Sequence, residues 1–93
     1  MIKSFADKRT EKIFEGQKVK RMPLELQKKA LRRLRYIDAA ERIEDLMVPP
    51  SNKLEKKSGD LDGFYGIWVT RQFRIIFRFE DGNAYDVEFI DYH

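Results

Sequence analysis

The spacing of apolar residues divides the chain into a helical first half and a β-rich second half. In residues 23–46, apolar side chains recur every three or four positions, which is the period of an α-helix; they are Leu26, Ala30, Leu31, Leu34 and Ile37. Pro23 suits the first turn of a helix, where its missing N–H costs no hydrogen bond. Pro49 and Pro50 cannot continue one, so we expect a last turn around Leu46 just before them.

Two smaller elements precede this helix. Residues 1–6 place Ile2 and Phe5 among polar neighbours and predict a short first strand. Residues 7–16 predict a short helix, because Asp7 can accept a hydrogen bond from the first turn and Gly16 stands where helices often end.

The second half predicts three strands joined in antiparallel order. These strands cover residues 64–70, 73–80 and 84–92. The first two are rich in β-branched and aromatic residues, as strands are. The third alternates, with Tyr85, Val87 and Phe89 on one face and acids on the other. Asp81 and Gly82 are typical of a hairpin turn between the last two strands.

This order of elements predicts the fold class. One strand, two helices and three antiparallel strands indicate an α+β domain, with both helices packed on one face of a twisted antiparallel sheet. A chain of 93 residues forms one domain. No repeat or linker interrupts residues 1–93, so we expect a single domain over that whole range.

The middle strand of the second half has an arginine face. Arg74, Ile76 and Arg78 alternate with aromatic and aliphatic residues that face the helices. The two arginines are therefore expected on the solvent side of the sheet. Ordinary surface arginines would give this pattern, and so would a phosphate-binding site, because the guanidinium fork matches phosphate oxygens.

The C-terminal residues are predicted to lie near these arginines. In a simple hairpin across Asp81 and Gly82, residues 91–93 fall opposite residues 71–73. This brings Asp91, Tyr92 and His93 within reach of Arg71 and Arg74. His93 is the only histidine in the sequence.

Composition excludes several classes of site. The sequence has no cysteine, which removes disulfides, cysteine-ligated zinc and thiol nucleophiles and suits a reducing cytoplasm. No apolar run approaches the roughly 18 residues of a membrane helix, and residues 1–10 lack the apolar core of a signal peptide. We therefore expect a cytoplasmic protein with no membrane partner.

Charge is distributed unevenly along the chain. Residues 1–35 carry twelve basic against four acidic residues, whereas residues 36–93 carry seven against twelve. A basic segment favours a polyanion or an acidic protein surface as partner. A solvated, lysine-rich helix face would have the same composition, so charge alone leaves both interpretations open.

The remaining polar groups suit cleavage of RNA. The sequence has no glycine-rich phosphate loop and no Ser-His-Asp arrangement with identifiable partners. It does offer an acid, a phenol, an imidazole and guanidinium groups. RNA carries its own nucleophile, the ribose 2′-OH, so a protein needs only to deprotonate it, stabilise charge on phosphorus and protonate the leaving 5′-oxygen. No metal or cofactor is expected.

Several stretches resemble one family along nearly the whole chain. They are the opening MIKSF, IDAA followed by EDL, PPSNKLE, GDLDG, FRIIFRFEDGNAYDVE and the terminal DYH. In this order and spacing, the sequence resembles HigB-type toxins of the RelE superfamily, the toxin half of type II toxin–antitoxin pairs. The resemblance implies a compact α+β toxin domain that cleaves mRNA without a metal while the ribosome translates it.

The resemblance also implies partners. A neighbouring antitoxin, usually a helix-turn-helix DNA-binding protein of the HigA type, would hold the toxin inactive. Operator DNA would be bound only through that antitoxin. A non-catalytic RNA- or ribosome-binding protein, and a degenerate toxin that retains only antitoxin binding and operon regulation, are the alternatives.

Site residues follow from the matching positions. The resemblance implies that Arg74 binds the scissile phosphate and that Asp91, Tyr92 and His93 supply base, acid or orienting groups. Many relatives read KLHPLKG where this chain reads KLEKKSG, so Glu55 replaces a histidine. A subgroup reading PPxNRLExLxG fits better, with Glu55 as proton acceptor.

Further cations are expected to contact the RNA, and one aromatic residue is not. The expected RNA-binding residues are Lys53, Lys56, Lys57, Arg71 and Arg78. The basic residues of the long helix could grip ribosomal RNA or simply face solvent. Trp68 is expected in the core or at a partner interface.

Overall fold

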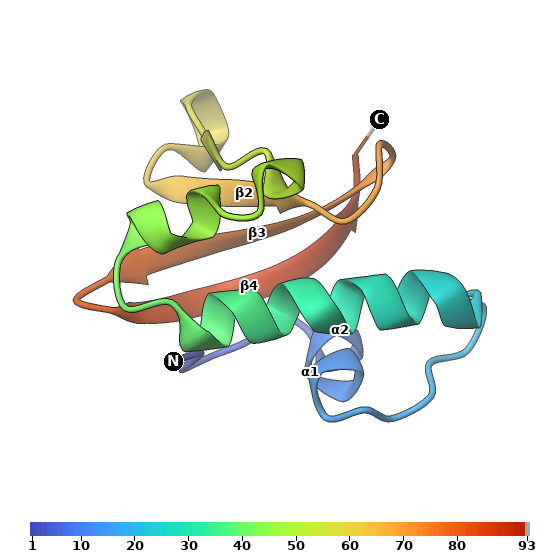
Figure 1. Cartoon of the computed structure of the whole chain (residues 1–93). Helices are drawn as coiled ribbons and strands as arrows, with labels where there is room; N and C mark the ends of the chain where they lie inside the picture. Colours follow the sequence, from blue (N-terminus) through green and yellow to red (C-terminus); the bar gives the residue numbers. More distant parts are fainter. Residues whose placement is uncertain (93) are drawn as a thin grey trace.

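A four-stranded antiparallel sheet with two helices on one face forms the protein (Figure 1). The computed structural model describes residues 1–92. The strand order is β1-β2-β3-β4, and the bounds are α1 Lys8–Phe14, α2 Leu24–Ala39, β1 Glu55–Lys56, β2 Phe64–Trp68, β3 Phe73–Glu80 and β4 Asn83–Asp91. Three short 3-10 helices lie between α2 and β2, at Ile43–Met47, Pro50–Asn52 and Gly59–Leu61. The predicted α+β class is confirmed.

The core lies between the helices and one face of the sheet. From α2, Ala30, Leu34 and Ile37 are fully buried, and from β3, Ile75 and Phe77 are fully buried. Their spacings are those of a helix stripe and of alternate strand positions, as the sequence predicts. The aromatic side of β3 therefore faces the helices, and the Arg74 side faces away from them.

The last two strands form the expected hairpin. Glu80 pairs with Asn83, and the two turn residues have positive φ angles, 51° at Asp81 and 77° at Gly82. Such a turn matches the twist of the strands that it joins. The pairing continues to Phe73 opposite Asp91, so the predicted register at the far end of the hairpin is confirmed.

The N-terminal segment lies along the outer edge of β4 but forms only two isolated bridges. Ile2 pairs with Ala84 and Phe5 with Val87, both in parallel. Between them β4 has a bulge at Asp86, where φ is 53°. The amide N–H of Asp86 donates to the Ser4 hydroxyl at 2.9 Å. The predicted first strand is thus present as an edge segment, because the bulge interrupts a regular ladder.

Two details of the strand predictions are wrong. The short strand β1 is absent from the predicted strands, because two residues are too few to give a periodic pattern. Tyr85 does not share a face with Val87 and Phe89, because the extra residue at Asp86 shifts the alternation. Tyr85 instead lies opposite Arg78.

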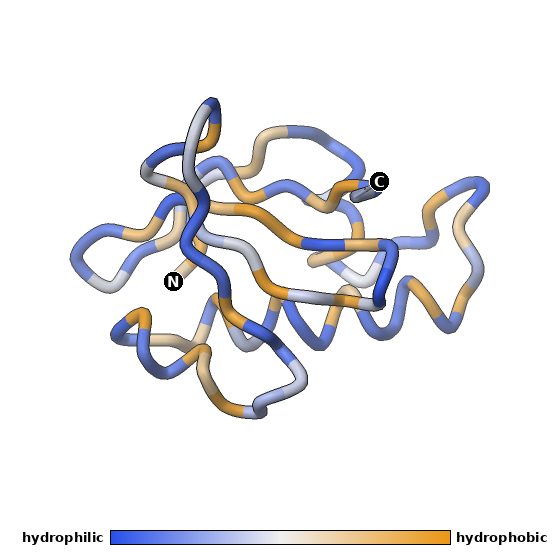
Figure 2. The backbone as a smooth tube through the Cα atoms, turned by 90° about the horizontal axis from the view of Figure 1, so that it is seen from above, coloured by the Kyte–Doolittle hydropathy of each residue, from blue (hydrophilic) through white to orange (hydrophobic). Residues whose placement is uncertain are grey.

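Polar side chains are spread over every element. In Figure 2 the orange hydrophobic stretches of the backbone are interrupted by blue hydrophilic ones along helices and strands. Within residues 1–92, no helix is both long and apolar enough to cross a membrane.

After α2 the chain turns at Asp45, whose carboxylate accepts hydrogen bonds from the amides of Arg42 and Glu41 at 3.0 and 2.9 Å. These backbone donors lower the pKa of Asp45.

One buried hydroxyl joins α1 to the sheet. Thr10 is fully buried, and its Oγ1 accepts from the amide N–H of Phe89 at 2.9 Å. Arg9, beside it, donates to the Phe89 carbonyl at 3.1 Å. These two bonds cover the edge of β4 beyond the N-terminal segment, so that the backbone of the edge strand is not left open.

We predict that Thr10→Val destabilises the protein by about 1–3 kcal/mol, because it leaves the buried Phe89 N–H without an acceptor. Urea unfolding would measure this loss. Thr10→Ser is the control, since it keeps the hydroxyl acceptor and should protect the Phe89 amide from hydrogen exchange. Equal exchange of that amide in the valine and serine variants would contradict the assignment.

Candidate functional site

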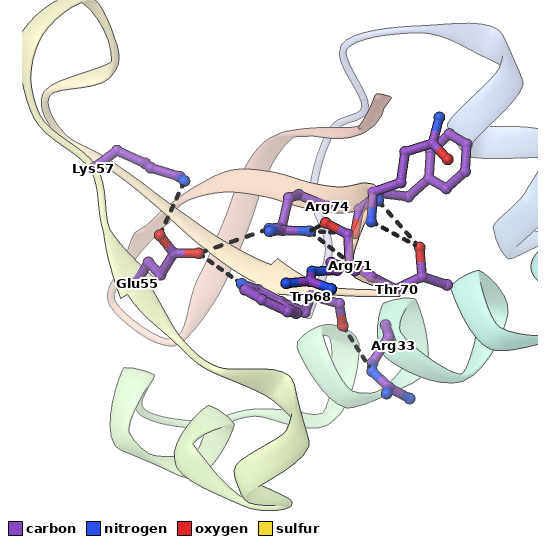
Figure 3. A network of polar contacts seen from close by, with 9 residues as sticks. Arg33, Glu55, Lys57, Trp68, Thr70, Arg71 and Arg74 are labelled. Carbon is purple, nitrogen blue, oxygen red and sulfur yellow. Dashed lines mark hydrogen bonds and ion pairs between the residues drawn. The ribbon is translucent and has the colours of Figure 1, made fainter. Parts of the chain in front are cut away.

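The sheet face away from the helices carries a cluster of polar and aromatic side chains. Antiparallel pairing sets Glu55 opposite Gly66, and Trp68 opposite Arg74. Directly paired residues point to the same face of a sheet. Glu55, Trp68 and Arg74 therefore meet on this face, as Figure 3 shows.

Arg74 is held at the centre of the cluster. Its Nη1 donates to the carbonyls of Thr70 and Arg71, at 2.7 and 2.6 Å, and its Cζ lies 3.8 Å from the centre of a Trp68 ring. The residue is only 6% exposed. The second terminal nitrogen, Nη2, makes no hydrogen bond to another group of residues 1–92.

This burial corrects one expectation. We expected Arg74 on the solvent side of the sheet, and it does lie on the face away from the core. The ring centres of Trp68 and Tyr92, however, lie 3.8 and 5.0 Å from Arg74 Cζ, so the two rings cover the guanidinium. A buried guanidinium costs free energy unless polar partners surround it, and the turn carbonyls and Glu55 provide them.

Glu55 connects the members of the cluster. Its Oε1 accepts from the Trp68 indole N–H at 2.9 Å and lies 3.8 Å from Arg74 Nε. Its Oε2 lies 3.5 Å from Lys57 Nζ. The 3.8 Å separation is too long for a hydrogen bond, and the buried Nε of Arg74 has no hydrogen-bond partner among residues 1–92. The Glu55 side chain is 40% exposed, so a substrate can reach it.

Lys57 lies under the exposed aromatic ring of Tyr92. The lysine is 8% exposed, and its Nζ lies 4.4 Å from the ring centre of Tyr92. Its stem crosses Gly66, where an added Cβ would lie 2.9 Å from Lys57 Cε. The absence of a side chain at Gly66 therefore lets this ammonium group reach the cluster.

Strand β4 brings Tyr92 to the cluster but places Asp91 on the opposite face of the sheet. The amide N–H of Tyr92 donates to the Gln72 carbonyl at 2.7 Å. Asp91 pairs with Phe73 and accepts from the Gln72 side chain at 3.3 Å. Because Phe73 packs against the core, Asp91 lies on the opposite face from Arg74. His93 lies outside the described residues.

The expected RNA-binding cations are divided. Lys53 reaches the cluster, with Nζ 5.0 Å from the centre of a Trp68 ring. Lys56 is exposed and pairs with Tyr65, which places it on the other face from Glu55. Arg71 is exposed in the β2–β3 turn. Arg78 lies four residues along β3 from Arg74 and is paired with Asp86 at 3.6 Å.

Of the two places expected for Trp68, the structure rules out the core, and the partner interface stays a prediction. Trp68 lies outside the buried core and contacts Glu55, Arg74 and Lys53. The register of the β2–β3 hairpin was the available signal, because it sets Trp68 opposite Arg74.

The charge of the cluster suits an anionic ligand. Lys57 and Arg74 lie beside the Glu55 carboxylate and Lys53 lies beside Trp68, so the balance of charge is positive. Tyr92 adds an aromatic ring that is 44% exposed, to which a base could stack. Residues 1–92 contain no group of three or more histidine, cysteine, aspartate or glutamate residues arranged to hold a metal ion.

Comparison with known proteins assigns the family. The model for the HigB-like toxins, described as the RelE-like toxin of type II toxin–antitoxin system HigB, matches residues 3–93. Toxin HigB-1 of Vibrio cholerae is 36% identical over 94 residues, covering 100% of this chain and 98% of the relative. Endoribonuclease HigB of Proteus vulgaris is 36% identical over 93 residues and is covered completely, as is this chain.

Solved structures share the fold. The YoeB–YefM toxin–antitoxin complex from Staphylococcus aureus contains a chain with a TM-score of 0.64 and 20% identity, covering 100% of this chain and 95% of that one. A YoeB dimer from the same organism gives a TM-score of 0.62, again at 20% identity, over 99% and 94% of the two chains. At this identity the likeness supports the RelE-like fold alone. Together with the family match over nearly all residues and the full-length relatives, it leads to one conclusion: the chain belongs to the HigB-like family of RelE-like toxins of type II toxin–antitoxin systems.

Proposed function

We propose that this toxin is an endoribonuclease that cleaves mRNA while the ribosome translates it, and that it needs no metal. The observation that carries the proposal is the closeness of a phosphate-binding group to a proton acceptor, since Arg74 Nε and Glu55 Oε1 lie 3.8 Å apart on one face. The relative from Proteus vulgaris is named an endoribonuclease. Action on translating ribosomes would place the protein in the cytoplasm.

Arg74 is proposed to bind the scissile phosphate. Its Nη1 is occupied by the carbonyls of Thr70 and Arg71, which fixes the plane of the guanidinium and directs Nη2 to the ligand. Charge develops on the phosphate oxygens as the nucleophile adds, so a fixed donor there stabilises the transition state more than the ground state. Lys57 would add a second positive charge nearby.

Glu55 is proposed to act as the general base. It would take the proton of the ribose 2′-OH, and the freed oxygen would attack the adjacent phosphorus. The bond from phosphorus to the 5′-oxygen then breaks, leaving a 2′,3′-cyclic phosphate and a 5′-OH. Partial exposure of Glu55 suits this role, because a ribose 2′-OH can reach its carboxylate.

The leaving 5′-oxygen needs a proton, for which the chain end offers two candidates. Tyr92 lies beside Arg74 and Lys57, and its phenol could donate or its ring could stack on a base. His93, outside the described residues, is proposed as the general acid, because an imidazolium can give a proton to the leaving oxygen. Asp91 would act from the other face, by orienting the chain end through Gln72.

The outlying cations are proposed to guide the RNA rather than to take part in the reaction. Arg71 lies in the turn that holds Arg74, and Arg78 and Lys56 lie farther away. Contacts of this kind add affinity that falls with salt.

An antitoxin is proposed as the protein partner. The matching family is described as part of toxin–antitoxin systems, and the similar YoeB chain was solved in complex with the antitoxin YefM. For this chain we propose a helix-turn-helix antitoxin of the HigA type, through which alone the pair would contact operator DNA.

Induced expression tests the proposed function directly. We expect growth arrest and, by primer extension, cuts in translated mRNA but not in the same mRNA lacking a start codon. If the wild type makes no cuts, the protein is not a nuclease and a non-catalytic binding role replaces this proposal. Cuts in the untranslated mRNA would remove the ribosome from the mechanism.

We predict that Arg74→Ala lowers cleavage by about 100-fold, because it removes a donor aimed at the developing charge. Circular dichroism should show a folded protein. Arg78→Ala is the matched variant, on the same strand and face but exposed; it should weaken RNA binding at low salt while bound RNA is still cut. Equal losses of cleavage in the two variants would contradict the central role of Arg74.

We predict that Gly66→Ala lowers cleavage by about tenfold, or ~1.4 kcal/mol of barrier, because its Cβ displaces the Lys57 ammonium. The clash is with the end of a flexible side chain, so thermal stability should change little. Lys57→Met should give the same loss, and the double variant should lose no more than either single one. Additive losses would show that Gly66 acts by another route.

A further inference from the structure

Trp68 is the only tryptophan in the sequence, and it contacts both groups assigned above to the reaction. Its indole N–H donates to Glu55 Oε1 at 2.9 Å, and a ring face lies 3.8 Å from Arg74 Cζ. The backbone of Trp68 is itself fixed from the other layer, because Arg33 of α2 donates to its carbonyl at 3.0 Å. Figure 3 shows these contacts side by side.

We propose that Trp68 is a positioning residue that holds the Glu55 carboxylate and the Arg74 guanidinium apart, in the arrangement that RNA cleavage requires. This proposal rests on the proposed function. It assigns one task to the indole N–H and another to the ring face, and the two tasks can be tested separately.

The N–H prevents the base from pairing with the phosphate-binding group. Glu55 Oε1 forms its hydrogen bond with the indole, while its distance to Arg74 Nε is 3.8 Å. Without the indole bond, a carboxylate oxygen would approach a guanidinium nitrogen to about 2.7–2.9 Å. Such a pair would neutralise the charge meant for the phosphate and occupy the oxygen meant for the 2′-OH. The indole bond therefore holds Oε1 away from Arg74 and leaves the guanidinium charge to the phosphate.

The ring face sets the plane of the guanidinium. Arginine stacks on aromatic faces, and at 3.8 Å the Trp68 ring covers one side of Arg74. Two turn carbonyls hold Nη1 in that plane. Because Nη1 is occupied by carbonyls and Nε is buried, Nη2 is the donor that we assign to a phosphate. Lys53, 5.0 Å from the centre of a Trp68 ring, adds positive charge beside the same indole.

A purely packing role would have different consequences. Trp68 is partly exposed and does not belong to the buried core. Replacing its indole by a phenyl ring keeps an aromatic face and removes the N–H donor. If Trp68 only packs, this change should not depend on whether residue 55 is a carboxylate.

A double-mutant cycle tests the N–H. Cleavage of ribosome-bound mRNA would be measured in single turnovers for wild type, Trp68→Phe, Glu55→Gln and the double variant. We expect Trp68→Phe to lower the rate about tenfold with an unchanged melting temperature, and to have no effect when Glu55 is already glutamine. An equal loss in both backgrounds, or no loss in either, would overturn the role of the N–H.

A binding measurement tests the ring face. The probe is an mRNA with a 2′-deoxy nucleotide at the cleavage position, which lacks the nucleophile and stays intact. Trp68→Phe should bind it as wild type does, whereas Trp68→Leu, which has no aromatic face, should bind about tenfold more weakly. Tight binding by the leucine variant would show that the ring does not position Arg74.

Fluorescence of the single tryptophan separates failure of this proposal from failure of the proposed function. Without any RNA, Glu55→Gln and Arg74→Ala should each change the emission of Trp68, because each alters a group in contact with the indole. Unchanged emission in both variants would refute the contacts, whatever the wild type cleaves. If the emission changes in both variants but the wild type makes no cuts, the contacts are confirmed. The proposed cleavage and the positioning role of Trp68 are then both refuted.

Discussion

Antiparallel pairing of β2 with β3 is the constraint on which both layers of the protein depend. The same register that buries Ile75 and Phe77 against the helices sets Trp68 opposite Arg74 on the other face. A slip by one residue would turn Arg74 into the apolar core and its neighbours out to solvent. The free energy that fixes the core therefore also fixes the candidate site, and the site needs no separate cavity.

The burial of charge is the second constraint. One carboxylate, that of Glu55, partners two buried cations. Arg74 and Lys57 are both nearly covered, and the free energy cost of burying them is offset by Glu55, by turn carbonyls and by aromatic faces. Because one negative charge faces two buried positive ones, the cluster retains a net positive charge. The phosphate proposed to bind here would complete the charge balance.

The sequence predicts the parts of this protein that follow from periodic patterns. The α2 stripe, the faces of β3 and the Asp81–Gly82 turn all have local signals, and that turn alone brings Tyr92 to the correct end of β3. The bulge at Asp86 and the two-residue strand β1 have no periodic signal, so the facing of Tyr85 and the sheet position of Glu55 were missed. Burial of Arg74 depends on contacts with Trp68 and Tyr92, which lie 6 and 18 residues away along the chain, and only the folded structure shows them.

The residue at position 55 fits the rest of this cluster through its number of acceptors. Sequences with the KLHPLKG pattern have a histidine at this position, and a neutral imidazole accepts one hydrogen bond. A carboxylate offers two oxygens with about four lone-pair sites. Here Oε1 serves the Trp68 N–H and faces Arg74, and Oε2 faces Lys57. A neutral imidazole could not accept from the Trp68 N–H and from Lys57 at once, and it carries no negative charge to offset the two buried cations. Glu55, Lys57 and Trp68 therefore form a matched set, in which each side chain has the geometry that the other two require.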